Sequence, residues 1–185
     1  DCDSCHSGYE QYCSNGNTGT YNAPDKISGG YTKGGYSDKI VVKESFVLRI
    51  PDNLDLRAAA PLLCAGITTW SPLQHWNVKR GDKVGIIGLG GLGHMAVKFA
   101  HAMGAEVTMI TTSPEKGADA RKLGADKILL SNDPVAMKQH SHSFDFLLNT
   151  IPVGHDPNPY IMLLKRDATM VFVGALEPLR DLNSR

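Results

Sequence analysis

The chain has 185 residues, begins with Asp1, and carries 19 Lys and Arg residues against 19 Asp and Glu residues. This balance gives no electrostatic reason to expect nucleic acid or a membrane surface as a partner, and we expect neither. No stretch approaches the roughly eighteen consecutive apolar residues of a membrane-spanning helix. No signal peptide is visible either, although loss of an N-terminal segment would remove one. The composition is that of an ordinary soluble protein.

The four cysteines are unevenly distributed. Three of them, Cys2, Cys5 and Cys13, stand in the segment CDSCHSGYEQYC, and Cys64 stands alone in the apolar run APLLCAGITTW. This pattern is unlike the disulfide framework of a small secreted domain. We therefore expect a reducing compartment, the cytoplasm, and use of the thiols for metal binding or catalysis.

The spacing of the first three cysteines, C-x2-C-x7-C, favours a zinc site. Thiolates two residues apart can present both sulfurs to one ion across a tight turn, and the third brings the chain back to the same ion. A chance cluster, or one disulfide with a spare thiol, remains as an alternative. Zinc is preferred because Ser4, Ser7 and Gly8 suit tight loops and no apolar pattern explains burial. A closed zinc site has four ligands, so one ligand is missing from this segment.

The first part of the chain predicts loops and a few antiparallel strands. Residues up to about 50 are rich in Gly, Tyr, Ser, Asn and Lys. One extended stretch, YSDKIVVKESFVLRIP at 36–51, has the β-branched and aromatic residues of a strand, with Pro51 at its end. From Asn53 the character changes, and a helix-like segment runs to Trp76.

Strands and helices alternate in the remainder of the chain. The predicted strands are 83–88, 106–110, 127–130, 144–149 and 169–174, and the predicted helices are about 91–103, 113–124 and 160–165. Five short apolar strands separated by helices indicate an α/β fold with a doubly wound parallel sheet.

The strongest local motif is GIIGLGGLGHMAVKFA, in which Gly88, Gly90 and Gly93 form G-x-G-x-x-G between a strand and a helix. The first glycine permits a tight turn, the second lets the backbone approach a pyrophosphate, and the third lets the helix pack closely. The helix N-terminus then faces the phosphates. The alternative is a merely tight strand-to-helix turn, but the context favours dinucleotide binding.

The end of the next strand indicates which dinucleotide is bound. An NAD site usually has Asp or Glu about 20 residues past the glycines, to accept hydrogen bonds from the ribose 2′-OH. Here the sequence is ITTSPEK, with hydroxyls at Thr111, Thr112 and Ser113, a charge at Lys116 and no carboxylate at the strand end. Glu115 stands at the helix start, where interaction with the helix dipole explains it. NADP(H) is therefore favoured over NAD(H).

Five separated segments of the chain together resemble a known family. The segments CDSCHSGYEQYC, GGYSDKIVV, APLLCAGITTWSPL, GLGGLGHMAVKFAHAMGA and LLKRDATMVFVGA look, in this order, like the middle of a zinc-dependent medium-chain alcohol dehydrogenase of the cinnamyl alcohol dehydrogenase and NADPH-dependent aldehyde reductase branch. The resemblance implies that 1–54 is the C-terminal part of a GroES-like catalytic domain with a zinc lobe. It implies that 55–185 is an incomplete Rossmann domain that binds NADP(H).

The resemblance also implies roles for single residues. Cys2, Cys5 and Cys13 match three ligands of a structural zinc, whose first ligand would lie just before Asp1. Cys64 matches a catalytic zinc ligand, although from its apolar neighbours alone it would be a small buried residue. The positions that match the NADP(H) site are Thr68, Gly88, Leu89, Gly90, Gly91, Leu92, Gly93, Thr111, Thr112, Ser113, Lys116, Thr150 and Gly174.

The implied function is interconversion of primary alcohols and aldehydes by hydride transfer, with zinc and NADP(H) as cofactors and a homodimeric parent enzyme. The remaining catalytic zinc ligands would come from an N-terminal region absent from this chain, so the chain alone is expected to be inactive. The alternative is a non-catalytic nucleotide-binding or zinc-stapled interaction module. A zinc-free quinone reductase is disfavoured by the cysteine lobe and by Cys64.

Overall fold

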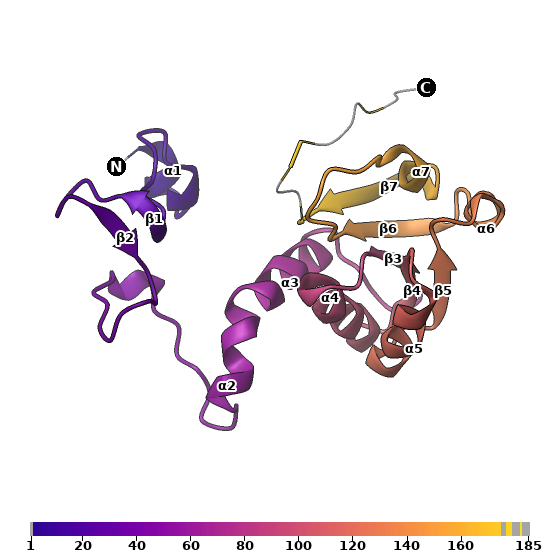
Figure 1. The fold of residues 1–185 in the computed structure, drawn as a ribbon, viewed down its shortest axis with the longest axis horizontal. Coiled ribbons are helices and arrows are strands. Elements are labelled where there is room, and N and C mark those ends of the chain that lie inside the picture. The colour runs from indigo at the N-terminus through magenta and orange to yellow at the C-terminus, as the bar shows by residue number, and fades with distance from the viewer. Residues whose placement is uncertain (1, 175–176, 179–181, 183–185) are drawn as a thin grey trace. The chain divides into compact units, whose positions relative to one another are not determined.

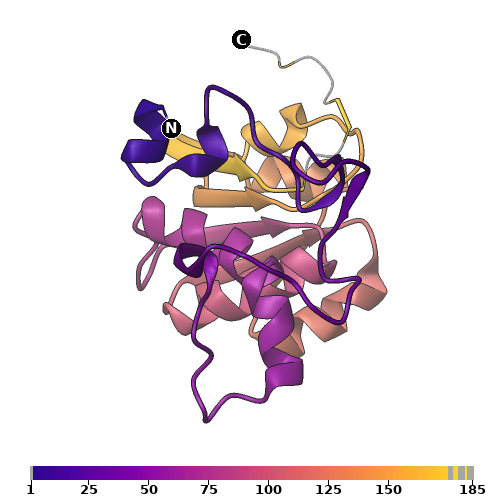
Figure 2. The ribbon, with the colours of Figure 1, turned by 90° about the vertical axis from the view of Figure 1, so that its left-hand side faces the viewer.

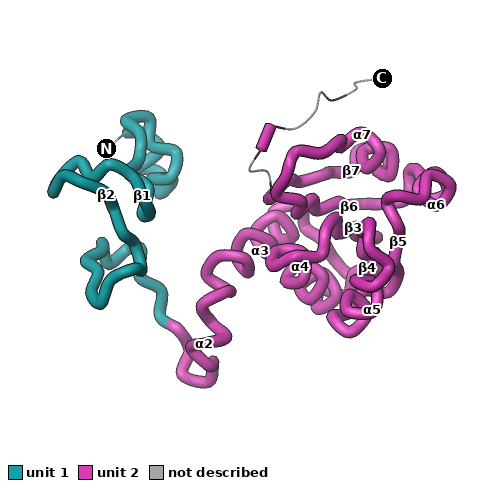
Figure 3. Tube along the Cα trace, in the orientation of Figure 1, with its two compact units in different colours: residues 1–49 teal, residues 50–185 magenta. Residues whose placement is uncertain are grey.

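The computed structural model describes residues 2–174, 177–178 and 182. The chain divides into two compact units, Asp1–Arg49 and Ile50–Arg185, called unit 1 and unit 2 (Figure 3). The division lies close to the change of character near Asn53 in the sequence. The assignment of 1–54 and 55–185 to two named domains stays a prediction.

Unit 1 is made of short elements without a buried core. Its elements are α1 (Asp3–His6), η1 (Glu10–Tyr12), β1 (Tyr21–Pro24), β2 (Tyr31–Lys33) and η2 (Glu44–Phe46). β1 and β2 pair antiparallel, with Tyr21 opposite Lys33 and Pro24 opposite Tyr31. None of the residues described in unit 1 is buried.

The prediction of a strand over 36–51 is wrong. Glu44–Phe46 forms a 3-10 turn, and the described residues around it carry no strand. Val41 is 99% exposed, and Ile40 and Val42 are also exposed. A strand needs a partner for its backbone hydrogen bonds and a surface for its side chains, and this stretch has neither within unit 1. β-propensity by itself does not supply them.

Unit 2 alternates helices and strands (Figure 1). Its helical elements are α2 (Leu56–Ala59), η3 (Ala60–Leu63), α3 (Ala65–His75), α4 (Gly91–Ala102), α5 (Pro114–Leu123), α6 (Pro134–Gln139) and α7 (Asn158–Ile161). Its strands are β3 (Lys83–Ile87), β4 (Glu106–Thr111), β5 (Lys127–Leu130), β6 (Phe144–Asn149) and β7 (Leu164–Phe172). α2 runs directly into η3, and the single residue Cys64 separates η3 from α3 (Figures 1 and 2). Among the described residues, no helix is long and apolar enough to cross a membrane.

The five strands of unit 2 form one parallel sheet in the order β5-β4-β3-β6-β7. Val84 of β3 lies opposite Val107 of β4 and Phe146 of β6. The chain builds the sheet outward from β3 through β4 and β5, and then returns to add β6 and β7 on the other side of β3. This confirms the predicted doubly wound α/β fold. It also places the topological switch point between β3 and β6, where ligands bind in such sheets.

The two faces of the sheet carry separate apolar cores, because successive side chains of a strand point to opposite faces. One core contains Val84, Ile86 and Met109 with residues of α3, α4 and α5. The other contains Ile87 and Ile110 with residues of α6 and the segment after α7. Helices therefore cover both faces, as a parallel sheet requires.

Two elements of unit 2 differ from prediction. The helix expected at 160–165 is α7, which covers only Asn158–Ile161, and Leu164 already begins β7. α6 was not predicted, although Asp133 at its N-cap accepts hydrogen bonds from the N–H groups of Val135 and Ala136 at 3.0 and 3.1 Å. Asp followed by Pro is the sequence signal that marks this helix start.

Candidate functional site

The three N-terminal cysteines meet around one point in unit 1. Cys2 Sγ lies 3.8 Å from Cys5 Sγ and 4.0 Å from Cys13 Sγ. All three sulfurs lie within 4.8 Å of one another. Tetrahedral thiolates with zinc–sulfur bonds of about 2.3 Å stand about 3.8 Å apart. The turns formed by α1 and η1 thus hold three sulfurs at spacings that fit a zinc ion.

The chemistry of Cys2 also fits a metal ligand. Hydrogen bonds from Ser14, first from its side chain and then from its backbone N–H, lower the pKa of Cys2 to about 5. The Ser14 nitrogen lies 3.4 Å from the sulfur. Cys2 is therefore a thiolate at neutral pH, which is the form that binds zinc. All four cysteines are free thiols, so the disulfide alternative is not realised in this structure.

The glycines after β3 have the backbone geometry that the motif predicts. Gly88 has a φ of +91°, which a residue with a side chain rarely adopts. A Cβ on Gly93 would stand 1.9 Å from the carbonyl oxygen of Gly88, so the helix packs too closely for any side chain. A Cβ on Gly90 would meet nothing within 4 Å, which leaves its backbone open to a ligand.

The N-terminus of α4 is available for an anion. Gly90 is its N-cap, and no side chain caps the helix. The first N–H groups of a helix have no partner within it, and the helix dipole adds positive potential there. Phosphate binds well at such a helix start.

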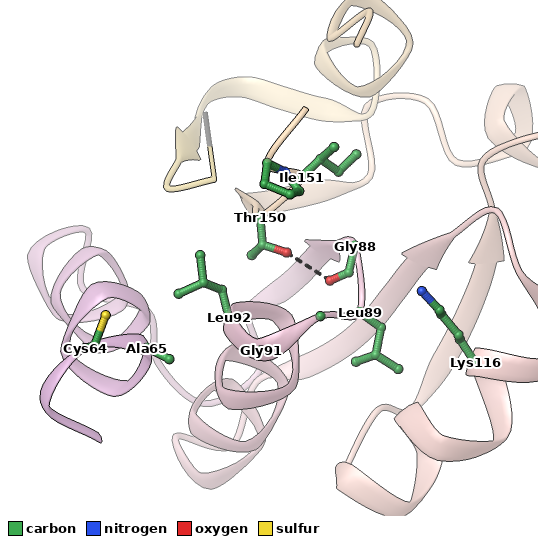
Figure 4. A pocket seen from close by; sticks show the side chains of 11 residues that line it. Cys64, Ala65, Gly88, Leu89, Gly91, Leu92, Lys116, Thr150 and Ile151 are labelled. Carbon is green, nitrogen blue, oxygen red and sulfur yellow. Dashed lines mark hydrogen bonds between the residues drawn. The ribbon is translucent and has the colours of Figure 1, made fainter. Parts of the chain in front are cut away.

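A cleft of about 550 Å³ opens beside this turn (Figure 4). It is lined by Cys64, Ala65, Gly88, Leu89, Gly90, Gly91, Leu92, Lys116, Thr150, Ile151 and Pro152. These residues come from the start of α3, the glycine turn, α5 and the segment after β6. The cleft therefore lies at the switch point between β3 and β6, and in Figure 4 Cys64 and Lys116 flank the glycine turn on opposite sides.

Thr150 fixes the two sides of the switch point to each other. Its hydroxyl donates to the carbonyl oxygens of Ile87 at 2.9 Å and Gly88 at 3.0 Å, and its N–H also donates to Ile87. Gly174 packs against the same residue, because a Cβ on Gly174 would stand 2.5 Å from the Thr150 carbonyl group. Both residues therefore shape the cleft through the backbone, whatever contact they make with a ligand.

The predicted 2′-phosphate residues are not equivalent in the structure. Thr111 is buried, and its hydroxyl accepts the Ser113 N–H at 3.2 Å. The Ser113 hydroxyl donates to Glu115 at 2.6 Å, and this bond holds the pKa of Glu115 below its usual range. Thr112 and Lys116 are exposed, and Lys116 lines the cleft. Thr112 and Lys116 are therefore the groups most accessible to a phosphate.

Cys64 and Thr68 lie at the start of α3. Cys64 is exposed and lines the cleft, so its thiol is not the buried apolar group that its neighbours alone predict. Thr68 is half-buried and donates its N–H to the Cys64 carbonyl oxygen at 3.0 Å. Thr68 supports the helix turn that carries Cys64 but is not among the residues that line the cleft.

Sequence reasoning missed three residues of the cleft wall: Ala65, Ile151 and Pro152. Ala65 directly follows Cys64, and the other two directly follow Thr150. For Ile151 and Pro152 the available signal was their position after the strand predicted at 144–149, since binding residues of parallel sheets gather where strands end. Ala65 lay inside the helix-like segment predicted from Asn53 to Trp76, where no such signal existed.

The fold and this cleft agree with the comparison to known proteins. A family described as zinc-binding dehydrogenase matches residues 91–185. The chain belongs to this zinc-binding dehydrogenase family.

Individual relatives support the same assignment. The chain is 53% identical over 175 residues to "Aldehyde reductase YahK" of Escherichia coli K12, covering 94% of this chain and 50% of that protein. It is 46% identical to a cinnamyl alcohol dehydrogenase structure from Sorghum bicolor, with a TM-score of 0.91 over 98% of this chain and 52% of that one. It is 41% identical to a Helicobacter pylori structure titled as CAD complexed with NADP(H), with a TM-score of 0.83 over 94% and 49%. The chain spans about half the length of the relatives it matches.

Proposed function

We propose that this chain forms the NADP(H)-binding part and the zinc lobe of an oxidoreductase that interconverts primary alcohols and aldehydes. The observation that carries the proposal is one cleft that joins an uncapped glycine turn to an exposed cysteine, Cys64. The names of the relatives, an aldehyde reductase and cinnamyl alcohol dehydrogenases, support the same reaction class.

The arrangement of the cleft suggests how a dinucleotide would lie in it. Its pyrophosphate would bind the N–H groups at the start of α4, where Gly90 leaves room for close approach. Its 2′-phosphate would bind Lys116, which lies on one side of the turn in Figure 4, and the exposed Thr112 that precedes α5. The other end of the dinucleotide would then point toward Cys64, on the opposite side.

Two zinc sites follow from the thiols. Cys2, Cys5 and Cys13 would hold a structural ion, for which their sulfur spacing fits. Cys64 would be one ligand of a catalytic ion, which further protein ligands would complete. When bound, such an ion would supply Lewis acidity toward an aldehyde carbonyl, and NADPH would supply the hydride.

The test is reduction of cinnamaldehyde or benzaldehyde by the protein that contains this chain, followed as oxidation of NADPH. We expect Cys64→Ser to lower kcat by a factor on the order of 100 or more, with little effect on NADPH affinity. Thr69→Ser is a matched control on the same helix, because Ser keeps the hydroxyl that donates to the Ala65 carbonyl oxygen at 2.8 Å. NADPH binding without any aldehyde reduction would contradict the proposal and favour a non-catalytic nucleotide-binding module.

The remaining parts of the proposal concern the setting of the protein. A cytoplasmic location is supported by the four free thiols, which suit a reducing compartment. The substrates would be small aldehydes or alcohols, and the proposed homodimer rests on the family resemblance alone. We propose no nucleic acid or membrane partner, in line with the balanced charge.

A further inference from the structure

The segment that joins β6 to α7, residues 150–157, belongs to no helix or strand, and its first three residues form one wall of the cleft. Ile151 and Pro152 line the cleft, and the next residue, Val153, is 51% exposed. Thr150 anchors the beginning of the segment to the end of β3. Some other contact must fix the path of the residues that follow, because backbone in a loop has no regular hydrogen-bond ladder.

Two contacts do so: the Gly154 N–H donates to Glu177 Oε2 at 2.7 Å, and a chain of hydrogen bonds runs through Asn149 and His155. Asn149 is the last residue of β6 and is fully buried. Its side-chain oxygen accepts the Ile151 N–H at 3.1 Å, and its side-chain nitrogen lies 2.8 Å from Nε2 of His155. The Nδ1 atom of His155 lies 2.8 Å from the Val153 carbonyl oxygen.

The chemistry of these groups fixes their donor and acceptor roles. A carbonyl oxygen can only accept, so His155 Nδ1 carries the proton and donates to Val153. In the neutral imidazole Nε2 is then an acceptor, and it accepts from the Asn149 amide. That amide must in turn present its oxygen to the Ile151 N–H. Each partner therefore determines the orientation of the next.

Loss of the Nε2 acceptor would leave the buried amide nitrogen of Asn149 without a partner. A buried donor without a partner is costly, so the amide would rotate or the loop would move. Either change breaks the bond to Ile151, which lies in the cleft wall. The ring of Tyr160, at 6.2 Å from the imidazole ring with an edge-on orientation, holds His155 from the side of α7.

We propose that His155 is a positioning residue for the cofactor cleft. Its Nε2 atom accepts a hydrogen bond from the Asn149 side chain and fixes the orientation of that amide. The amide oxygen in turn holds the Ile151 N–H, and with it the wall of the cleft. The part of this inference that concerns NADP(H) rests on the proposed function. The hydrogen-bond chain itself does not.

Three substitutions separate an acceptor role from simple filling of space. Gln at 155 can place its side-chain oxygen where Nε2 stands, whereas Asn is too short and Ala has no acceptor. His142→Asn is the matched control, because the His142 ring contacts the Leu164 carbonyl oxygen and not Asn149, and Asn tolerates its φ of +53°.

The first readout is hydrogen exchange of the Ile151 amide in the 185-residue chain without cofactor. We expect His155→Ala and His155→Asn to speed this exchange roughly five- to tenfold, the value of one hydrogen bond. His155→Gln and His142→Asn should leave it near the wild-type rate. Equal exchange in all five proteins, or the same acceleration in the Gln and Asn variants at 155, would overturn the proposal.

The second readout is the affinity of the same chains for NADPH. We expect the Kd for NADPH to rise roughly three- to tenfold in His155→Ala and His155→Asn, because a loosened wall must be ordered on binding. In His155→Gln the Kd should return to near the wild-type value. Unchanged NADPH affinity despite faster Ile151 exchange would overturn the positioning role. If the wild-type chain binds no NADPH, the proposed function fails, and the exchange rates still decide whether the hydrogen-bond chain operates.

Discussion

Among the residues that the structure describes, unit 1 buries none, whereas unit 2 buries apolar clusters on both faces of its sheet. A segment of fewer than 50 residues without a core needs another source of stability, and in unit 1 three thiol groups converge at metal-binding distances. Unit 2 needs no metal for its fold, because helices and sheet already remove its apolar side chains from water. The two units should therefore respond differently to loss of metal and to substitutions in the core of unit 2.

The largest expected effect is that of zinc removal. A strong chelator should abolish the ordered signals of residues 2–14 in unit 1 and leave the thermal unfolding of unit 2 unchanged, because metal bound by Cys2, Cys5 and Cys13 would supply folding energy that unit 1 has no core to provide. Backbone NMR spectra of the 185-residue chain would show this. Cys5→Ser should reproduce the loss and Cys64→Ser should not. Equal loss of signals in both units would contradict the comparison.

The next effect concerns the close approach in the glycine turn of unit 2. Gly93→Ala places a Cβ 1.9 Å from the Gly88 carbonyl oxygen, so we expect destabilisation by about 3 kcal/mol and loss of NADPH binding. Gly91→Ala is the control, because a Cβ there meets nothing within 4 Å. Urea unfolding of both variants gives the comparison. Similar stability of the two variants would show that the turn is less tightly packed than described.

Cofactor preference is expected to change by a smaller amount. Thr112→Asp should shift preference from NADPH toward NADH by about tenfold, because a carboxylate repels the 2′-phosphate and favours a free 2′-OH. Thr112 is a better test position than Thr111, which is buried. The measurement is the affinity of the variant for each cofactor. An unchanged ratio of the NADPH and NADH affinities would show that Thr112 does not contact the 2′-phosphate.

Lys116→Ala should weaken NADPH binding more at low salt than at high salt, because salt screens an exposed charge pair. Lys122→Ala on the same helix is its control, since Lys122 pairs with Asp119 at 3.1 Å. The affinities of both variants at two salt concentrations give the test. An equal loss at both concentrations would argue against a charge interaction with the phosphate.

The smallest effect concerns an ion pair at the start of β6. Partial burial raises the pKa of Asp145, but the Lys165 ammonium at 2.7 Å and the Lys83 N–H at 3.0 Å outweigh it and hold that pKa below its usual range. The stability from this group is therefore present above about pH 4 and is lost as pH falls through the lowered pKa.

Asp145→Asn should accordingly cost about 1 kcal/mol at neutral pH, an amount limited by solvent screening, and the cost should disappear in acid. Urea unfolding of unit 2 at several pH values measures it. Asp119→Asn, which breaks a fully surface-exposed pair, should have no measurable effect. A cost for Asp145→Asn that stays constant with pH would show that the carboxylate charge is not responsible.

The elements that the sequence predicted well are those determined by local signals. β3, the glycine turn and α4 follow one another with an apolar strand, obligatory glycines and helical periodicity, so even their bounds could be predicted. The segment 36–51 failed because its β-branched residues show a preference for strand but not whether a partner strand exists. The end of α7 was misplaced because the apolar residues around Leu164 fit a helix and a strand equally well.

The candidate site could be predicted in its residue types but not in its hydrogen bonds. The spacing of Cys2, Cys5 and Cys13 and the resemblance at Cys64 indicated the thiols that the structure exposes or brings together. Burial of Thr111 and the link between Asn149 and His155 depend on how the end of one strand meets the next loop. Such tertiary contacts leave no periodic pattern in a single sequence.

The most direct test of the account is a titration of the 185-residue chain with NADPH and with NADH, in the presence of zinc and again after chelation. We expect NADPH to bind more tightly than NADH, and removal of zinc to change neither affinity, because the cleft lies wholly in unit 2. Tighter binding of NADH, or loss of NADPH binding on chelation, would contradict this expectation.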